Sequence, residues 1–307
     1  MVSVNHTEVS PIARRKANAP SLRVRLRRRA FGMLNAVAPR IAGRRAADAF
    51  GFTRGYGLPV SDRVPLGATE TPIEGNADID RAYCWEGGAS RVLLVHGWGT
   101  DSSSMLSFVK PMQNLGFSVA SFDAPAHGRS PGKHTTMTQF TRATGAVLDA
   151  IEGAHVVIAH SLGSIAAVSA LAERSRRASL RCIVLIAPTC GLTEVLERWA
   201  SRDMAFQRPV VERIFAELHR RNGVPVSHWD ILARGASLDV PVLVVHDPAD
   251  SVVPYCEAQR VVAGLQDATL WPAPGAGHGR ILSDARVREQ VREFVMRQTS
   301  NFGELAR

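Results

Sequence analysis

The sequence predicts an α/β fold built on a mostly parallel sheet that helices cover on both faces. Short apolar runs alternate along the chain with stretches of helical periodicity, the pattern typical of a parallel sheet. The runs are almost continuously apolar, as expected for strands that are buried on both faces. The 307 residues, 45% hydrophobic and 21% charged, suffice for one such domain with an inserted subdomain.

Residues 1–50 are predicted to form a basic N-terminal extension, disordered to about residue 20 and helical from Leu22 to Phe50. The first 45 residues hold eleven Lys and Arg and one acid, which leaves 26 basic and 27 acidic residues beyond them. The net charge of +9 is therefore local to the extension. Apolar residues at helical spacing predict a helix that docks on the domain and is interrupted or bent near Pro39: Leu26, Ala30, Leu34, Val37 and Ile41.

The arginine-rich start of this helix leaves other roles open. A weak contact with an anionic membrane surface is one of them. No specific nucleic-acid binding is predicted, because no basic patch is interleaved with aromatic residues. Arg28 and Arg29 precede an apolar stretch that faintly resembles a twin-arginine export signal, but the stretch is short and soon meets Arg40. We expect a cytoplasmic protein, with twin-arginine export as the alternative.

The sequence offers no pattern for a metal or a nucleotide cofactor. Its four cysteines lie scattered without metal-ligand spacing: Cys84, Cys182, Cys190 and Cys256. We expect reduced, buried thiols, although a pairing of Cys182 with Cys190 stays open. Neither of the common glycine-rich phosphate-binding motifs occurs. The prediction is therefore that the protein has no cofactor and no metal.

The main domain is predicted to span residues 51–307 and to begin with a Gly- and Pro-rich connector over 51–66. Short strands are expected between Ala68 and Glu86. Further strands are expected at 91–95, 117–122, 156–159, 182–187, 241–246 and 268–271. Helices are expected at 103–115, 136–152 and 284–297. Two or three helical stretches pass without a strand over about 190–236, which predicts an inserted helical cap.

The stretch from Val156 to Ala167 organises the rest of the chain. Four apolar residues run into Ser161, which has Ala159 and Gly163 two places to either side, and a helix-forming run follows. A strand, a sharp turn and a helix at this spacing lift the serine hydroxyl clear of the sheet edge. The alternative is a core strand that ends on a helix-capping serine.

Other chemically suggestive residues follow the ends of the later strands, where parallel sheets gather their functional groups. Asp247 and Asp250 follow the strand at 241–246, and His278 lies on a glycine-flanked loop after the last strand. A serine hydroxyl is a poor nucleophile unless a histidine takes its proton and an acid orients that histidine. The chain therefore carries a nucleophile, an acid and a base in that order.

Five short signatures support a resemblance to the α/β-hydrolase superfamily over about residues 67–297. They are His-Gly-Trp-Gly at 96–99, Asp-x-Pro-x-His-Gly-x-Ser at 123–130, the turn at 159–163, Asp-x-x-Val-Pro at 250–254, and Gly-His at 277–278. The resemblance implies a sheet of the α/β-hydrolase type with a small helical cap. It also selects Asp250 over Asp247 as the acid, and leaves Asp247 as a turn-making residue before Pro248.

The remaining site residues are expected to hold the oxyanion or shape its loops. Backbone N–H groups of Trp98 and Leu162 are the predicted oxyanion donors. Five residues are predicted to shape these loops: His96, Gly97, Gly99, His160 and Gly163. His127 is expected to stabilise a turn.

The predicted function is a serine hydrolase that cleaves a small or medium carboxylic ester, or a thioester, through an acyl-enzyme. Its partner would be a small-molecule ester. C–C bond hydrolysis and perhydrolysis use the same residues and stay open, as does a non-catalytic ligand receptor or interaction scaffold. The cap would select the substrate, and helical spacing explains its large apolar residues equally well as core: Trp199, Met204, Phe206, Phe215 and Trp229.

Overall fold

A computed structural model describes residues 22–53, 63–174 and 179–300. The disorder predicted for residues 1–20 lies outside the described residues, as does most of the connector predicted at 51–66.

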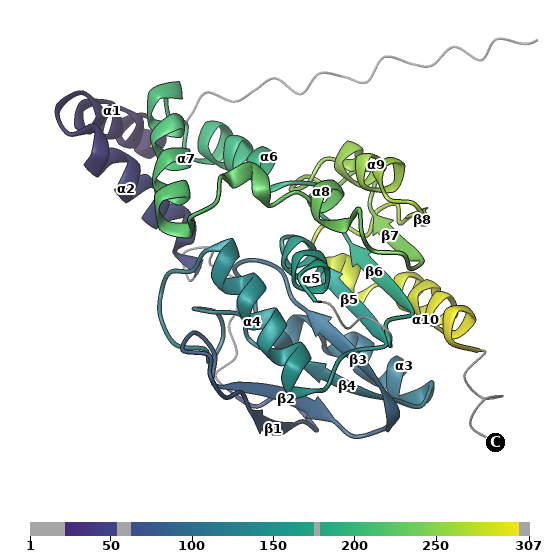
Figure 1. Ribbon diagram of the computed structural model, residues 1–307. Coiled ribbons are helices and arrows are strands. Elements are labelled where there is room, and N and C mark those ends of the chain that lie inside the picture. The colour runs from purple at the N-terminus through teal and green to yellow at the C-terminus, as the bar shows by residue number, and fades with distance from the viewer. Residues whose placement is uncertain (1–21, 54–62, 175–178, 301–307) are drawn as a thin grey trace, which may run out of the picture.

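Eight strands form one twisted sheet (Figure 1). The strands are β1 (Thr69–Pro72), β2 (Arg81–Trp85), β3 (Gly88–Val95), β4 (Phe117–Ser121), β5 (Val156–His160), β6 (Cys182–Ile186), β7 (Val242–His246) and β8 (Ala268–Pro272). Their order across the sheet is β1-β2-β4-β3-β5-β6-β7-β8, and β2 pairs antiparallel with both of its neighbours. The other six strands, β3 to β8, pair with one another in parallel, so their carboxyl ends meet at one edge.

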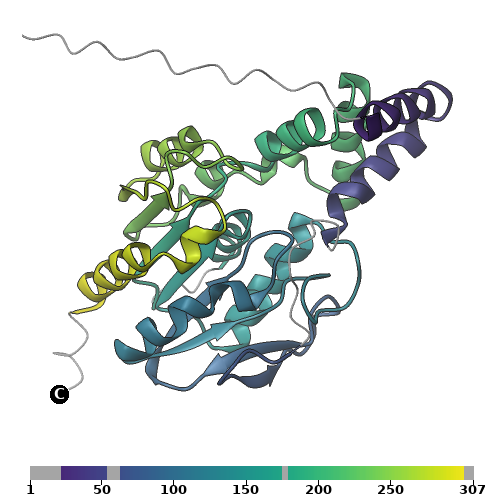
Figure 2. The same cartoon turned by 180° about the vertical axis from the view of Figure 1, so that it is seen from behind.

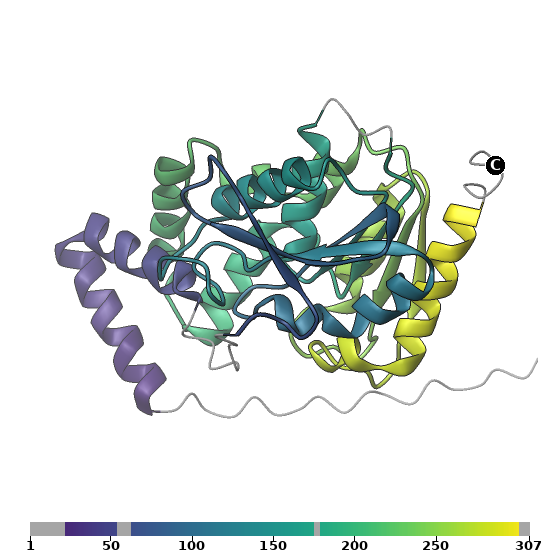
Figure 3. The ribbon, with the colours of Figure 1, turned by 90° about the horizontal axis from the view of Figure 1, so that it is seen from below.

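Helices cover both faces of this sheet, which confirms the predicted fold class (Figure 3). One face carries α4 (Met137–Ala150), α5 (Gly163–Ala172), α8 (Ile231–Gly235) and α9 (Tyr255–Gly264). The other carries α3 (Val109–Asn114), the short turn η5 (Arg280–Ser283) and α10 (Ala285–Thr299). The strands between them are fully buried over most of their length.

The helix expected at 103–115 differs from the prediction. A 3₁₀ helix, η2 (Ser102–Phe108), precedes the short α3. Asp101 accepts hydrogen bonds from the N–H of Ser103 and, through its backbone carbonyl, from the Ser104 hydroxyl at 2.7 Å. The N–H of Ser104 also donates to the Asp101 carbonyl at 3.1 Å, the spacing of a 3₁₀ helix, and the α-helix begins only at Val109.

The N-terminal extension forms two helices, α1 (Leu22–Val37) and α2 (Pro39–Gly51), which meet at Ala38 just before Pro39. Figure 1 and Figure 2 show them beside α7 (Arg208–Asn222), at the end of the molecule away from α10. A Cβ added at Gly43 of α2 would lie 2.6 Å from the Cβ of Arg213, so the two helices are in close contact. The membrane contact predicted for the extension stays a prediction.

The segment between β6 and β7 contains the helices predicted for the cap. They are α6 (Leu192–Arg198), the π-helical turn η3 (Trp199–Asp203), α7, the 3₁₀ turn η4 (Val226–His228) and α8. A bridge between Gly191 and Asp230 closes the segment at its base. The elements from α6 to η4 lie above the carboxyl edge of the sheet, whereas α8 returns to the face that also carries α5.

Candidate active site

Ser161 follows β5 at a strained turn. Its φ is +52°, in the left-handed region that non-glycine residues rarely adopt. The N–H of Ser161 donates to the carbonyl of Ile186 at 3.0 Å, which fixes the turn to the neighbouring strand. The strand–turn–helix geometry predicted for this stretch is therefore present, and the serine does not act as a hydrogen-bonding cap of α5.

Two glycines allow the close approach of chain segments around Ser161. A Cβ added at Gly163 would lie 2.2 Å from the carbonyl oxygen of His96. A Cβ added at Gly97 would lie 2.8 Å from Nδ1 of His160 and 3.2 Å from the Cβ of Ser161. The loop after β3 therefore runs directly beside the serine, and any larger residue at either position would push it away.

Ser161, His278 and Asp250 form one chain of hydrogen bonds, although they come from three separate loops. Nε2 of His278 lies 3.1 Å from the Ser161 hydroxyl oxygen. Nδ1 of the same ring lies 2.8 Å from Oδ2 of Asp250. Since the Asp250 carboxylate can only accept, Nδ1 donates to it and Nε2 is left to accept from the serine.

The Asp250 side chain is fully buried and held as an anion. Burial opposes its ionisation, but the hydrogen bond and charge of His278 and the N–H groups of Val252 and Val253 outweigh it and lower the pKa of Asp250. The buried His246 ring adds a contact, with Nε2 3.5 Å from Oδ2 of Asp250. The carboxylate is thus fixed for orienting His278.

Asp247 does more than make the turn before Pro248. Its carboxylate accepts from the N–H of Ala249 at 2.9 Å, and also from Gly275 at 3.2 Å and Gly277 at 2.6 Å. The last two belong to the loop that ends in His278. Asp247 therefore holds the histidine loop in place, a role that nothing in the local sequence pattern around it indicated.

His160 is a neutral positioning group next to His278. Its Nε2 donates to the carbonyl of His278 at 3.0 Å, and the two rings lie 5.0 Å apart. Burial, together with the nearby charge of His278, lowers the pKa of His160 to about 3. The residue predicted to shape a loop therefore ties the Ser161 turn to the histidine loop.

Two further histidines hold the loop after β3. His96 donates from Nδ1 to the carbonyl of Gly97 at 2.7 Å, and its Nε2 accepts from the N–H of Ala124 at 2.9 Å. His127 accepts from the N–H of Gly99 at 2.9 Å while its Nδ1 donates to Pro125. Each of these rings bridges two loops at the carboxyl edge of the sheet.

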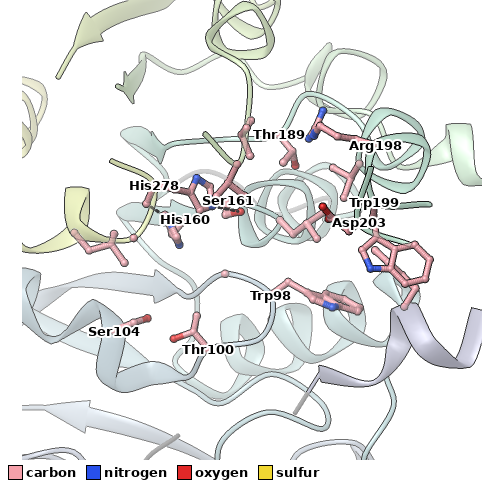
Figure 4. Close-up of a pocket in the computed structure, with 18 of the residues that line it drawn as sticks. Trp98, Thr100, Ser104, His160, Ser161, Thr189, Arg198, Trp199, Asp203 and His278 are labelled. Atoms are coloured by element: carbon pink, nitrogen blue, oxygen red, sulfur yellow. Dashed lines mark hydrogen bonds between the residues drawn. The ribbon is translucent and has the colours of Figure 1, made fainter. Parts of the chain in front are cut away.

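A cavity of about 630 Å³ opens beside Ser161 (Figure 4). Its sheet-side wall consists of loop residues that follow the strands: Gly97, Trp98, Ser161, Leu162 and His278. Its cap-side wall consists of helix residues: Phe50, Val195, Arg198, Trp199 and Arg202. Every predicted catalytic or oxyanion residue except the buried Asp250 therefore lines one cavity.

Sequence reasoning missed Phe50, which the basic extension contributes to this cavity. Its ring stacks on Trp98 at 5.3 Å and meets Trp199 edge-on at 5.2 Å. Among the large apolar residues suggested for the cap, Trp199 lines the cavity, whereas Trp229 is buried in the core and does not. Met204, Phe206 and Phe215 also pack into the core.

Within the described part of the chain, no three His, Cys, Asp or Glu side chains gather as metal ligands. All four cysteines are free thiols, so Cys182 and Cys190 are not paired. Cys256 is exposed, contrary to the expectation that the thiols are buried. None of the helices in the described ranges is both long and apolar enough to cross a bilayer.

Two family models match the chain. The model for "Serine aminopeptidase, S33" matches residues 89–229, and the model for "TAP-like protein" matches residues 221–301. Est1E from Butyrivibrio proteoclasticus, solved with ferulic acid bound, is similar in structure, with a TM-score of 0.61 and 18% identity over 76% of this chain and all of that chain. The two family models together cover residues 89–301, so the chain belongs to the α/β-hydrolase superfamily, and they support a hydrolase. The likeness to Est1E shows the fold.

Four curated relatives match at the level of sequence. The dihydrolipoyllysine-residue acetyltransferase component of the acetoin cleaving system from Cupriavidus necator is 29% identical over 178 residues, 50% of this chain. That match spans only 46% of the relative's own length. A putative carbamate hydrolase, RutD, from Variovorax paradoxus is 25% identical over 67% of this chain and 91% of the relative.

Proposed function

We propose that this protein is a serine hydrolase that cleaves a carboxylic ester, or a thioester, through an acyl-enzyme. The observation that carries the proposal is the chain of hydrogen bonds from Ser161 through His278 to Asp250, which opens into the cavity. Serine as nucleophile, histidine as base and aspartate as orienting acid are the roles that this geometry supports.

In the proposed first step, Oγ of Ser161 attacks the ester carbonyl carbon while Nε2 of His278 takes the hydroxyl proton. His278 then gives that proton to the leaving alkoxide or thiolate, and the acyl group stays on Ser161. In the second step a water molecule attacks the acyl-enzyme, with His278 again taking a proton. The free acid leaves and the serine hydroxyl is restored.

The oxyanion formed in each step requires donors close to Ser161, and the N–H groups of Trp98 and Leu162 are the proposed pair. Trp98 follows Gly97, whose backbone passes beside Ser161. Leu162 stands directly before the first turn of α5, where helix N–H groups are unpaired. Among the described residues, neither of these two N–H groups has a protein acceptor.

Labelling with a fluorescent fluorophosphonate tests whether Ser161 is activated. We expect stoichiometric labelling of the wild-type protein and none of Ser161→Ala. Ser104→Ala is the matched control, because Ser104 lines the same cavity but its hydroxyl donates to the carbonyl of Asp101. Unlabelled wild-type protein, or full labelling of Ser161→Ala, would remove the proposal.

A further inference from the structure

A polar cluster interrupts the apolar part of the cavity at the junction of β6 and the cap. Glu257 of α9 is 3% exposed, and its two carboxylate oxygens bind different partners. Oε2 accepts from the N–H of Cys190 at 3.0 Å, and Oε1 binds Nη1 of Arg198. One buried carboxylate therefore fixes both the backbone next to Thr189 and the guanidinium of Arg198, and it brings both to the cavity.

Thr189 lines this cavity and carries an unused hydroxyl. The residue is 1% exposed, and its Oγ1 has no hydrogen-bond partner among the described residues. A buried hydroxyl without a partner is costly, which is why such groups in native proteins usually mark a place for a ligand or water. Figure 4 shows Thr189 and Arg198 next to each other on the side of Ser161 opposite Trp98.

Arg198 lines the same cavity and keeps donors that no described residue uses. Its only hydrogen bond within the described ranges uses Nη1, so Nη2 and Nε are available. In this ion pair the Glu257 carboxylate is buried behind the cavity wall. The Arg198 side chain, which is 21% exposed, lies at the cavity. A planar guanidinium in this position matches a carboxylate in geometry as well as in charge.

The other charged groups at this wall are Arg202 and Asp203. They lie 3.8 Å apart, and their side chains are 61% and 57% exposed, so solvent screens both charges. Arg202 also donates to the carbonyl of Ser251 at 3.0 Å. The Arg198 guanidinium is the less exposed charge and so has the stronger effect on a bound ligand.

We infer that Thr189 and Arg198 form a subsite for a carboxylate carried by the substrate, remote from the scissile bond. This inference rests on the proposed function and narrows its substrate class to esters of an acidic compound. The substrate carboxylate accepts from the Thr189 hydroxyl and from the guanidinium of Arg198. Glu257 acts behind them as a positioning residue, since it holds Arg198 and the Cys190 backbone.

The test uses two matched pairs of esters and the full-length protein. Monoethyl glutarate and ethyl 5-methylhexanoate have the same shape but differ in charge at the end of the acyl half. The acetate ester of 4-hydroxybutanoate and 4-methylpentyl acetate differ in the same way in the alcohol half. For the wild type we expect kcat/KM to favour the acidic ester of at least one pair by about 10- to 100-fold, the range for a hydrogen-bonded charge.

Two substitutions assign that preference to the subsite. Thr189→Val removes only the unused hydroxyl, and Arg198→Lys keeps a partner for Glu257 but removes the planar fork. Each should reduce the acidic-over-neutral preference several-fold, with the loss falling mainly on kcat/KM for the acidic ester. Thr100→Val, at another cavity-lining threonine, is the matched control and should leave the preference intact.

Two outcomes would overturn the inference, namely equal kcat/KM for both members of each pair, or a preference that survives both substitutions. Either would leave the serine hydrolase itself in place, as judged by fluorophosphonate labelling and turnover of the neutral esters. Failure of the proposed function is different, because the wild type would then neither label nor turn over any ester.

Discussion

The two walls of the cavity are built in different ways. The sheet-side wall consists of loops that leave the ends of parallel strands, and hydrogen bonds from buried groups fix each loop. The cap-side wall consists of side chains on helices α2 and α6 and the turn η3, which pack on one another mainly through aromatic rings. This difference suggests that chemistry resides on the first wall and substrate selection on the second.

Substitutions of Ser161 and His278 should have the largest effect. Because nucleophile and base act as a unit, Ser161→Ala and His278→Ala should each lower kcat by about 10⁴-fold or more. The double variant should be little worse than either single one. Steady-state kinetics on one neutral ester measures all three proteins, and losses that multiply in the double variant would show that the two residues act independently.

Asp250→Asn should have the next largest effect, a loss of about 10⁴-fold in kcat, because an amide can no longer fix the imidazole tautomer. Asp247→Asn should lose about 10- to 100-fold, because one of its three N–H contacts would face the amide nitrogen and the histidine loop would shift. Circular dichroism checks that both variants fold. Equal losses at the two positions would contradict the separate roles.

On the cap-side wall, Trp199→Ala should change the preferred acyl length, with relative kcat/KM for long and short acyl esters shifting by about 10-fold. Trp229→Ala is the matched control, because this residue is 4% exposed and does not line the cavity. It should lower the free energy of unfolding by about 3–5 kcal/mol and leave the acyl profile unchanged. A changed profile in the control alone would reverse the assignment.

The smallest effect concerns the pH profile. With a pKa lowered to about 3, His160 stays neutral at every pH above about 4, so it takes no part in any loss of activity between pH 5 and 8. His160→Gln keeps a side-chain N–H for the carbonyl of His278. The variant should be slower by less than about 10-fold, with the acid limb of kcat/KM at the same pH as in the wild type. A displaced limb would identify His160 as the titrating base.

The sequence predicted the sheet-side wall well for a physical reason. Parallel strands are short, apolar and regular, and their ends must meet, so residues following them, such as Ser161 and His278, can be placed from spacing alone. The family resemblance then separated Asp250 from Asp247. The role of Asp247 in holding the histidine loop was not predicted from the sequence. Its partners on that loop are backbone N–H groups about 30 residues away, and backbone groups leave no side-chain pattern.

The cap-side wall was much harder to predict. Helical periodicity marks apolar residues that turn inward, but it cannot distinguish a side chain that meets the core from one that meets a cavity. Trp229 and Trp199 look alike by that criterion. Phe50 was missed because it lies over 100 residues from Ser161 in sequence, and the pair of Arg198 with Glu257 joins residues 59 apart.

The most direct test of the account is to trap the acyl group on the serine. Wild-type protein mixed with an activated acetate ester, quenched in acid within milliseconds and digested, should yield the peptide containing Ser161 with the added mass of one acetyl group. Ser161→Ala should yield no acetylated peptide from this segment under the same conditions. Ester turnover with no acyl group on Ser161 at any quench time, or an acyl group carried by another residue, would contradict the central claim.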